Sequence, residues 1–183
     1  MEKFDFRTPQ SDLLSLVIEG DRLKLSVIDN KFEQDIFREF TEEITTYMIP
    51  SPTKNIQETR DFIAASKHGI ESGYNLQFVV VSKINQEFLG NCGLHGNNNK
   101  AKTPEIGIWL KKDAYGQGYG LEAVTTLVNW SNKHINLDYF IYPVDRRNIA
   151  SRKIPESLEG KIIKEYQDKI SSAKILDLVV YKI

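Results

Sequence analysis

A glycine-rich stretch in the second half of the chain constrains the fold more than any other feature. Gly116, Gly118 and Gly120 alternate with Gln117 and Tyr119, between an apolar, strand-like segment and an amphipathic, helix-like one. Glycines let backbone amides approach a charged group closely, because no Cβ intervenes. The N-terminus of the following helix would direct its unpaired N–H groups and its positive dipole end at the same point. The stretch therefore predicts a strand, a tight loop and a helix that together bind a phosphate.

Composition narrows the class of protein. Of the 183 residues, 40% are hydrophobic and 27% charged, as in ordinary globular proteins, which predicts one domain over 1–183 with an N-terminal arm over 1–15. The net charge of −1 gives no electrostatic basis for binding nucleic acid or a membrane surface. No run of about 18 apolar residues and no signal-peptide core is present. The single cysteine, Cys92, excludes an internal disulfide. We expect a cytoplasmic monomer or homodimer.

Hydrophobic periodicity predicts the order of the elements. Strands are expected at 21–28, 76–82, 88–95, 104–110, 138–144, 161–168 and 175–183, and helices at 29–48, 55–72, 121–134 and 149–158. Asn85 and Gln86 are expected to form a turn, and Gly96–Asn99 a loop. This order predicts an α+β fold with a mixed, mostly antiparallel central sheet of about seven strands and about four helices on its faces.

Two common phosphate-binding loops fit the glycine stretch poorly. A nucleotide P-loop requires Gly-Lys-Ser/Thr, and no such lysine follows these glycines. A dinucleotide-binding loop requires G-x-G-x-x-G, whereas this loop is G-x-G-x-G, with Leu121 where the last glycine should fall. Asp145, after the next predicted strand, could serve as the ribose-binding acid, so a dinucleotide binder stays open. A tight turn that binds no ligand is a further alternative.

The sequence contains three informative stretches, at Glu105–Leu110, Tyr115–Val124 and Asn148–Ser151. Taken together they resemble the GCN5-related N-acetyltransferases (GNAT), and in particular the RimJ/RimL-like branch that acetylates ribosomal-protein N-termini and related small amines. The family loop, Arg/Gln-x-x-Gly-x-Gly/Ala, falls on Tyr115–Gly120, with Tyr115 in place of the usual first residue. The resemblance runs from Asp21 to about Gly160. It implies the GNAT fold, with a sheet splayed in the middle, and acetyl-CoA as co-substrate without a metal.

The resemblance also implies where the co-substrate lies. The pyrophosphate would accept hydrogen bonds from the amides of Gln117–Leu121. The pantetheine arm would pair with the edge of strand 104–110, where that strand splays from the next one. Asn148 would touch the co-substrate, although its simpler role is to cap a helix. The expected binding residues are Ile106, Ile108, Trp109, Leu110, Tyr115, Gly116, Gln117, Gly118, Tyr119, Gly120, Leu121, Asn148 and Ser151.

Acetyl transfer to an amine requires loss of a proton from the amine, stabilisation of an oxyanion and protonation of the departing thiolate. Glu105 is the candidate base, directly or through water, and a surface carboxylate is its alternative explanation. The oxyanion donor is expected to be a backbone N–H near Ile106–Ile108. By resemblance Ser151 would protonate the thiolate, and Tyr142 is the second candidate for that role.

The predicted function is acetyl-CoA-dependent transfer of an acetyl group to a primary amine by direct attack in a ternary complex. The acceptor stays open between a protein α-amine and a small molecule such as an aminoglycoside, a polyamine or an amino-acid conjugate. The alternative is a CoA-binding sensor or interaction module that kept the fold without turnover. His68, His95 and His134 lack metal-binding spacing, and no metal is predicted.

Overall fold

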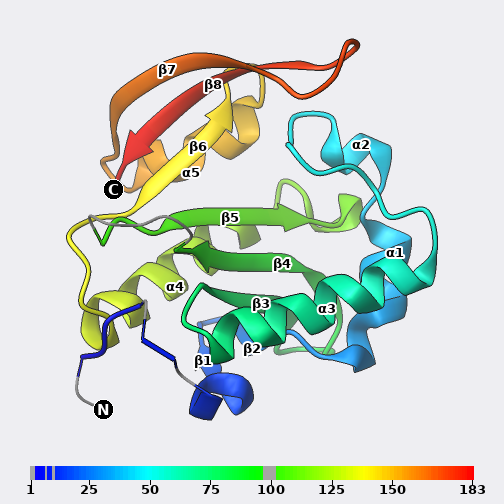
Figure 1. The fold of residues 1–183 in the computed structure, drawn as a ribbon, viewed down its shortest axis with the longest axis vertical. Coiled ribbons are helices and arrows are strands. Elements are labelled where there is room, and N and C mark those ends of the chain that lie inside the picture. Colours follow the sequence, from blue (N-terminus) through cyan, green and yellow to red (C-terminus); the bar gives the residue numbers. More distant parts are fainter. Residues whose placement is uncertain (1–2, 7, 10, 97–101) are drawn as a thin grey trace.

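The computed structural model describes residues 3–6, 8–9, 11–96 and 102–183, so Asn97–Asn99 of the predicted loop lie outside the described residues. One mixed sheet has the strand order β1-β2-β3-β4-β5-β6-β8-β7 (Figure 1). Its strands are β1 Val17–Glu19, β2 Leu23–Val27, β3 Asn75–Ser82, β4 Phe88–His95, β5 Glu105–Leu110, β6 Ile141–Asp145, β7 Lys161–Lys169 and β8 Ile175–Lys182. The α-helices are α1 Glu33–Glu39, α2 Glu42–Thr45, α3 Ile56–Glu71, α4 Tyr119–His134 and α5 Ile149–Ser157, and the 3-10 turns are η1 Ser11–Ser15, η2 Asn30–Phe32 and η3 Lys112–Ala114. The predicted α+β class with a mixed, mostly antiparallel sheet is confirmed.

The sheet is split between β5 and β6. All other neighbouring strands pair antiparallel, whereas β5 and β6 run parallel and share one register pair, Glu105 with Ile141. Beyond this pair the two strands diverge toward α2 (Figure 1). Only Ile106 of β5 is fully buried, although β4 beside it is buried along nearly its whole length. The gap therefore leaves backbone groups on the facing edge of β5 without a sheet partner.

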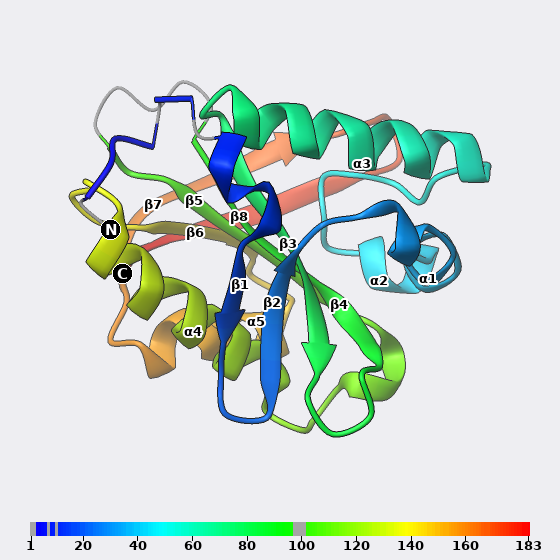
Figure 2. The ribbon, with the colours of Figure 1, turned by 90° about the horizontal axis from the view of Figure 1, so that it is seen from below.

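Helices cover the two faces of the sheet (Figure 2). On the α4 face, alternate strand residues such as Phe78, Leu94 and Ile106 pack with Val124 and Leu127 of α4. On the α3 face, the remaining alternation forms a smaller cluster with α1 and α3, composed of Ile28, Ile36, Ile63, Val79, Val81 and Phe88. Coverage of both faces explains why β3 and β4 are buried along nearly their full length and why Phe78–Val81 of β3 form a continuous apolar run.

The segment around α2 connects the two halves of the split sheet. Glu43 forms an ion pair with Lys112, which follows β5. Thr45 accepts a hydrogen bond from Lys174 in the β7–β8 turn, with 2.8 Å between Nζ and the carbonyl oxygen. Tyr47 lies beneath the guanidinium of Arg147, 5.4 Å from the ring centroid. These contacts cross the diverging end of β5 and β6, so α2 borders the gap.

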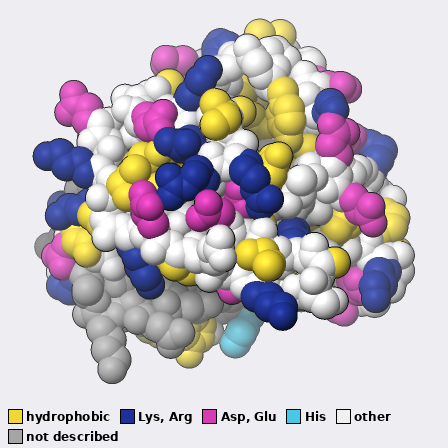
Figure 3. Space-filling view, turned by 90° about the horizontal axis from the view of Figure 1, so that it is seen from above, with side chains coloured by type: hydrophobic (Ala, Val, Ile, Leu, Met, Phe, Trp, Pro, Cys, Tyr) yellow, Lys and Arg dark blue, Asp and Glu magenta, His cyan; other side chains and the backbone are white. Residues whose placement is uncertain are grey.

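The outer strand β7 is exposed along nearly its whole length. Charged side chains of both signs interrupt its apolar residues, and Figure 3, which looks down on this side of the molecule, shows basic, acidic and apolar side chains intermixed. Charges at an edge strand disfavour pairing with another chain. No helix in the described ranges is both long enough and apolar enough to cross a membrane.

Three differences from the predicted elements have local causes. The helix expected at 29–48 is broken at Phe40, because Thr41 accepts a hydrogen bond from the Ile44 amide and begins α2 as a separate helix. β1 is only three residues long, too short to give a periodic signal. α4 begins at Tyr119, two residues earlier than expected, because Gly118 already serves as its N-cap. The sheet therefore has eight strands and the described chain five α-helices.

Candidate active site

The glycine loop lies where the sequence predicts it, between β5 and α4. Gly116 and Gly118 have φ angles of 72° and 80°, in the left-handed region that favours glycine. Gly118 is the N-cap of α4 and makes no side-chain capping hydrogen bond. The loop from Tyr115 to Gly118 is exposed to solvent. The first amides of α4 are therefore available to an external acceptor.

Arg22, at the turn before β2, fixes the shape of this loop. Its Nη1 donates to the carbonyl oxygen of Gln117 at 3.1 Å, and its guanidinium lies 4.7 Å from the centroid of the Tyr119 ring. Its Nε donates to Glu122 at 2.7 Å, and the side-chain Nε2 of Gln117 donates to the Asp113 carbonyl oxygen at 2.8 Å. Side chains of Arg22 and Gln117 thus donate hydrogen bonds to the carbonyl groups of Gln117 and Asp113 in and before the loop. Sequence reasoning missed Arg22, which lies 95 residues from Gln117.

The predicted acid candidates meet on the α4 face. The hydroxyls of Tyr142 and Ser151 are 2.8 Å apart, and Asn148 caps α5 by accepting from the Ser151 amide at 3.2 Å. Tyr142 is buried, and this burial raises the pKa of its hydroxyl well above the usual range. A Cβ on Gly120 would lie 3.1 Å from Ile154 of α5. The small size of Gly120 therefore lets α5 approach the start of α4.

Glu105 lies on the other face. Trp109 packs on the α3 face against Phe40 and Phe88, at centroid distances of 4.8 and 5.7 Å. Because alternate residues of a strand share a face, Glu105 and Gly107 lie there too. Burial raises the pKa of the Glu105 carboxyl. The predicted base and the predicted acids are thus on opposite faces of the split sheet.

His95 is directly opposite Glu105 in the β4–β5 register and shares its face. Its Nε2 is 2.8 Å from the position that a Cβ on Gly107 would occupy, so the ring lies over Gly107. Burial lowers the pKa of the imidazole. Sequence reasoning missed this pairing, although the antiparallel register of strands 88–95 and 104–110 could have indicated it.

The other predicted binding residues do not all lie on the same face of the sheet. Ile106, Ile108 and Leu110 pack toward α4, beside the gap. The Trp109 ring points away from them, so only its backbone remains available to a ligand at the β5 edge. Tyr115 and Leu121 are exposed. Asn91, the register partner of Trp109, is 1% exposed, and neither atom of its amide group has a partner among the described residues.

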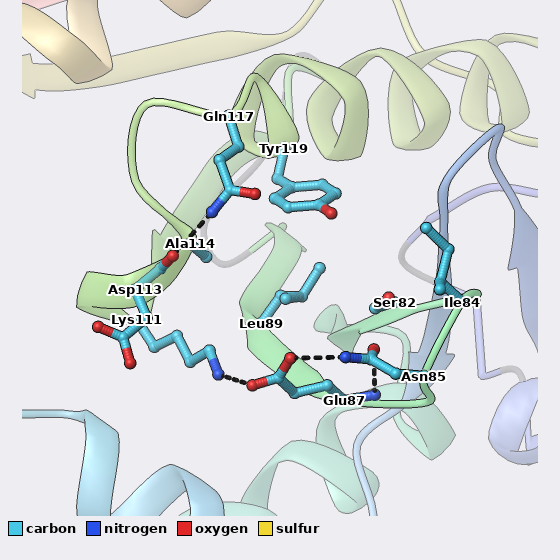
Figure 4. A pocket seen from close by; sticks show the side chains of 10 residues that line it. All are labelled: Ser82, Ile84, Asn85, Glu87, Leu89, Lys111, Asp113, Ala114, Gln117 and Tyr119. Carbon is cyan, nitrogen blue, oxygen red and sulfur yellow. Dashed lines mark hydrogen bonds and ion pairs between the residues drawn. The ribbon is translucent and has the colours of Figure 1, made fainter.

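A cavity of about 220 Å³ lies on the outer side of the glycine loop (Figure 4). Its lining comprises Ser82, Ile84, Asn85, Glu87, Leu89, Lys111, Asp113, Ala114, Gln117 and Tyr119. Figure 4 shows the ion pair between Lys111 and Glu87 along one side of it. Since no residue of β6 or α5 lines this cavity, it is separate from the gap between β5 and β6.

Asp145 does not support the dinucleotide alternative. Its carboxylate is fully buried and accepts hydrogen bonds from the guanidinium of Arg147, at 2.8 and 2.7 Å, and from the Asp177 amide at 3.0 Å. A ribose would have to displace these partners. In the described ranges, no group of three or more His, Cys, Asp or Glu side chains could hold a metal ion. Burial raises the pKa of the Cys92 thiol to about 12, so this cysteine is an inert core residue.

Comparison with known proteins identifies the family of this chain. Residues 22–161 match the model of the acetyltransferase (GNAT) domain. A relative named uncharacterized N-acetyltransferase p20, from Bacillus licheniformis, is 26% identical over 145 residues, covering 77% of this chain and 80% of its own.

Two solved structures share the fold at 16% identity. One is RimL, the ribosomal L7/L12 α-N-protein acetyltransferase in complex with coenzyme A, with a TM-score of 0.84 over 92% of this chain and 97% of its own. The other is spermidine N-acetyltransferase from Vibrio cholerae in complex with CoA and spermine, with a TM-score of 0.77 over 88% and 95%. With its split sheet and glycine loop, the chain belongs to the GNAT acetyltransferase family.

Proposed function

We propose that this protein transfers the acetyl group of acetyl-CoA to a primary amine by direct attack in a ternary complex. The observation that carries the proposal is the uncapped N-terminus of α4, behind two left-handed glycines and beside the unpaired edge of β5. A protein α-amine and a small-molecule amine are both candidate acceptors, as the named activities of RimL and of spermidine N-acetyltransferase illustrate.

The binding roles follow from the groups that the protein leaves unpaired. The amides of Gln117–Leu121 bind the pyrophosphate, where the α4 dipole favours negative charge. The β5 edge at Ile106, Ile108 and Leu110 pairs with the amide-rich pantetheine arm. Asn148 uses one acceptor position of its side-chain oxygen to cap α5, and its side-chain nitrogen is the donor left to contact the co-substrate. Acetyl-CoA supplies the acetyl group as a reactive thioester.

The two faces of the sheet separate the two proton transfers. The amine approaches from the α3 face, where Glu105 is the base candidate. Ser151 and Tyr142 protonate the departing thiolate from the α4 face. The raised pKa of Tyr142 keeps its hydroxyl protonated at neutral pH, as a donor must be.

A thermal-shift series with acetyl-CoA, CoA, NAD and ATP tests the binding part of this proposal. At about 100 times its Kd, a ligand of the native state adds about 2.7 kcal/mol to the free energy of unfolding. We expect acetyl-CoA and CoA to raise the melting temperature and NAD to leave it unchanged. A shift with NAD and none with acetyl-CoA would contradict the proposal.

Release of free thiol from acetyl-CoA tests the catalytic part. The panel comprises a serine-initiated peptide, spermidine, an aminoglycoside and an aminoacyl conjugate. Amine-dependent release with at least one of them is expected, and mass spectrometry locates the acetyl group. Tight binding of CoA with no release across the panel would favour the sensor alternative.

A further inference from the structure

We propose that His95 takes the proton from the acceptor amine and that Glu105 holds the ammonium group beside it. This inference rests on the proposed N-acetyltransferase function and divides a task that the sequence assigns to Glu105 alone. It concerns the α3 face at the point where β5 parts from β6.

The register places the two side chains at the start of the gap. His95 ends β4, Glu105 begins β5, and the two are direct cross-strand partners. Glu105 is also the last residue of β5 that pairs with β6. The imidazole extends from His95 over Gly107, so it lies past this last pair, beside the unpaired part of β5. The His95 ring reaches over β5 from the β4 side and therefore lies two residues beyond the last β5–β6 pair.

Gly107 makes this position possible. A Cβ at residue 107 would be 2.8 Å from Nε2 and 3.2 Å from Cδ2 of His95, so a side chain there would displace the ring. Neighbouring strands thus combine a histidine with a glycine that makes room for it. The oxyanion donor is expected among the backbone amides near Ile106–Ile108, so Nε2 lies above the backbone to which the thioester carbonyl would bind.

The three histidines differ in how their rings are engaged. The Nδ1 of His134 is 2.8 Å from the Trp130 carbonyl oxygen, and its ring stacks on Trp130. His68 is exposed on α3, next to Glu71 and Ser72. The ring nitrogens of His95 make no hydrogen bond to any described residue. A base with a free nitrogen can accept a proton from a substrate without first breaking an internal contact.

The charge states fit this division of roles. Burial lowers the pKa of His95, so the ring is neutral near pH 7 and can accept a proton. The ionisable group directly across from His95 is Glu105. Tyr166 of β7 is near Glu105, because burial and the charges of Asp168 and Glu105 raise the pKa of its hydroxyl. Burial raises the pKa of the Glu105 carboxyl, and in its ionised form this carboxylate attracts an ammonium group.

The step balances without another reactant. The R–NH₃⁺ group gives one proton to Nε2 of His95, and the freed electron pair forms the N–C bond to the acetyl carbon. The C–S bond breaks, and its electron pair leaves on sulfur. The thiolate takes a proton from the Ser151–Tyr142 pair, which regains one from water, and the nitrogen releases its second proton to water. His95 then releases its proton to water, so each acetyl transfer liberates one proton.

The first experiment compares His95→Gln, Glu105→Gln and the exposed control His68→Gln, using whichever amine of the panel is turned over. We expect His95→Gln to lower kcat/KM by about 10²- to 10⁴-fold, as for loss of a general base, and to remove the acidic limb of the pH profile. Glu105→Gln should mainly raise KM for the amine and keep that limb. His68→Gln should match the wild type. An acidic limb that survives in His95→Gln but disappears in Glu105→Gln overturns the proposal.

Two further measurements separate a chemical role from a structural one. Added imidazole should restore part of the activity of His95→Ala, whereas damage to the fold would not respond to it. Stabilisation by acetyl-CoA should be unchanged in His95→Gln, so failure of the proposed function, seen as no such stabilisation in the wild type, is distinct from failure of this inference.

An NMR titration of the histidine rings in the free protein requires no acceptor. The His95 ring should titrate below its ordinary pKa of 6.5. A His95 ring that is still charged above pH 7 could not take a proton there, and it would overturn the proposal even if no amine of the panel were acetylated.

Discussion

The two longest helices, α3 and α4, have 16 residues each, but their N-termini are capped differently. At α3, Asn55 accepts from the Glu58 amide at 3.1 Å, and Glu58 in return accepts from the Lys54 amide at 2.8 Å. At α4, Gly118 has no side chain to offer. In α3 a side chain of the N-cap residue satisfies the Glu58 amide, whereas in α4 the N-cap offers no such acceptor and the first amides are left to a ligand. This difference distinguishes the N-terminus of α3, which is capped for stability, from the N-terminus of α4, which can bind a ligand.

The protein compensates for the missing cap of α4 elsewhere. A glycine at the N-cap in place of a capping side chain costs about a few tenths of a kcal/mol. Ala123, Val124 and Leu127 of α4 are completely buried in the main core, and burial of one such aliphatic side chain contributes about 1.5–3 kcal/mol. Glu122 also ties the first turn of α4 to the amides of Arg22 and Leu23. Packing and this tie therefore hold the helix in place while its end stays open.

The largest effect is expected from Gly118→Val, which disrupts the uncapped N-terminus of α4. A β-branched residue at φ 80° is strained by about 1–3 kcal/mol, and relief of that strain would turn the loop amides away from their common point. We expect the Kd for acetyl-CoA, measured by calorimetry, to rise about 100-fold.

Gly116→Asn is the matched control for that variant. Residue 116 has a similar φ of 72°, no atom lies within 4 Å of an added Cβ, and asparagine tolerates this conformation. Its Kd should change by less than about 3-fold. Wild-type affinity in Gly118→Val would remove the loop from the site.

Asn55→Ala tests the capped N-terminus of α3. Loss of the α3 cap should lower the free energy of unfolding by about 1 kcal/mol, equivalent to a fall in Tm of about 2–4 °C for a chain of this size. The Kd for acetyl-CoA should stay at the wild-type value. A large loss of affinity here would mean that the two helix ends do not differ in function.

Arg22→Ala should have a smaller effect, because Arg22 is half exposed and holds only one side of the loop. An exposed ion pair contributes about 0–1 kcal/mol to stability. We expect affinity for acetyl-CoA to fall by about 3- to 5-fold, within that same range of free energy, while Arg22→Lys, which lacks the forked guanidinium, should be no better. An unchanged Kd in both variants would show that the loop keeps its shape unaided.

The smallest effect concerns Glu105 and depends on pH. Because burial raises the folded-state pKa of this carboxyl above its ordinary 4.5, folding favours the protonated form, and the carboxylate destabilises the protein as pH rises through that range. Glu105→Gln should therefore be more stable than the wild type in urea at about pH 8, with the difference vanishing at about pH 4. A variant less stable than the wild type at high pH would show that the carboxylate is stabilised by partners.

The sequence predicts the parts of this site that depend on local chemistry. The alternating glycines, the strand before them and the helix after them follow from backbone requirements that a few adjacent residues express. Asn148 as a cap of α5 follows likewise. The strands of the meander were found nearly to the residue, because their apolar runs are bounded by clear turns.

Features that depend on tertiary contacts could not be predicted in the same way. No glycine or proline marks the break at Phe40, which Thr41 and packing determine. The orientation of the Trp109 ring depends on Phe40, which is distant in sequence. Arg22 reaches the loop only because β2 lies beside the start of α4 in the fold. The position of His95 over Gly107 depends on strand register, which periodicity alone does not give.

The most direct test of the account is an amide NMR titration of the wild-type protein with acetyl-CoA. We expect large, saturable shifts at the amides of Gly118, Tyr119, Gly120 and Leu121, and no comparable shifts at Ile56, Gln57 and Glu58 at the start of α3. Saturable binding that leaves the α4 amides unmoved, or that shifts both helix ends equally, would contradict the claim that α4 alone is open to the pyrophosphate.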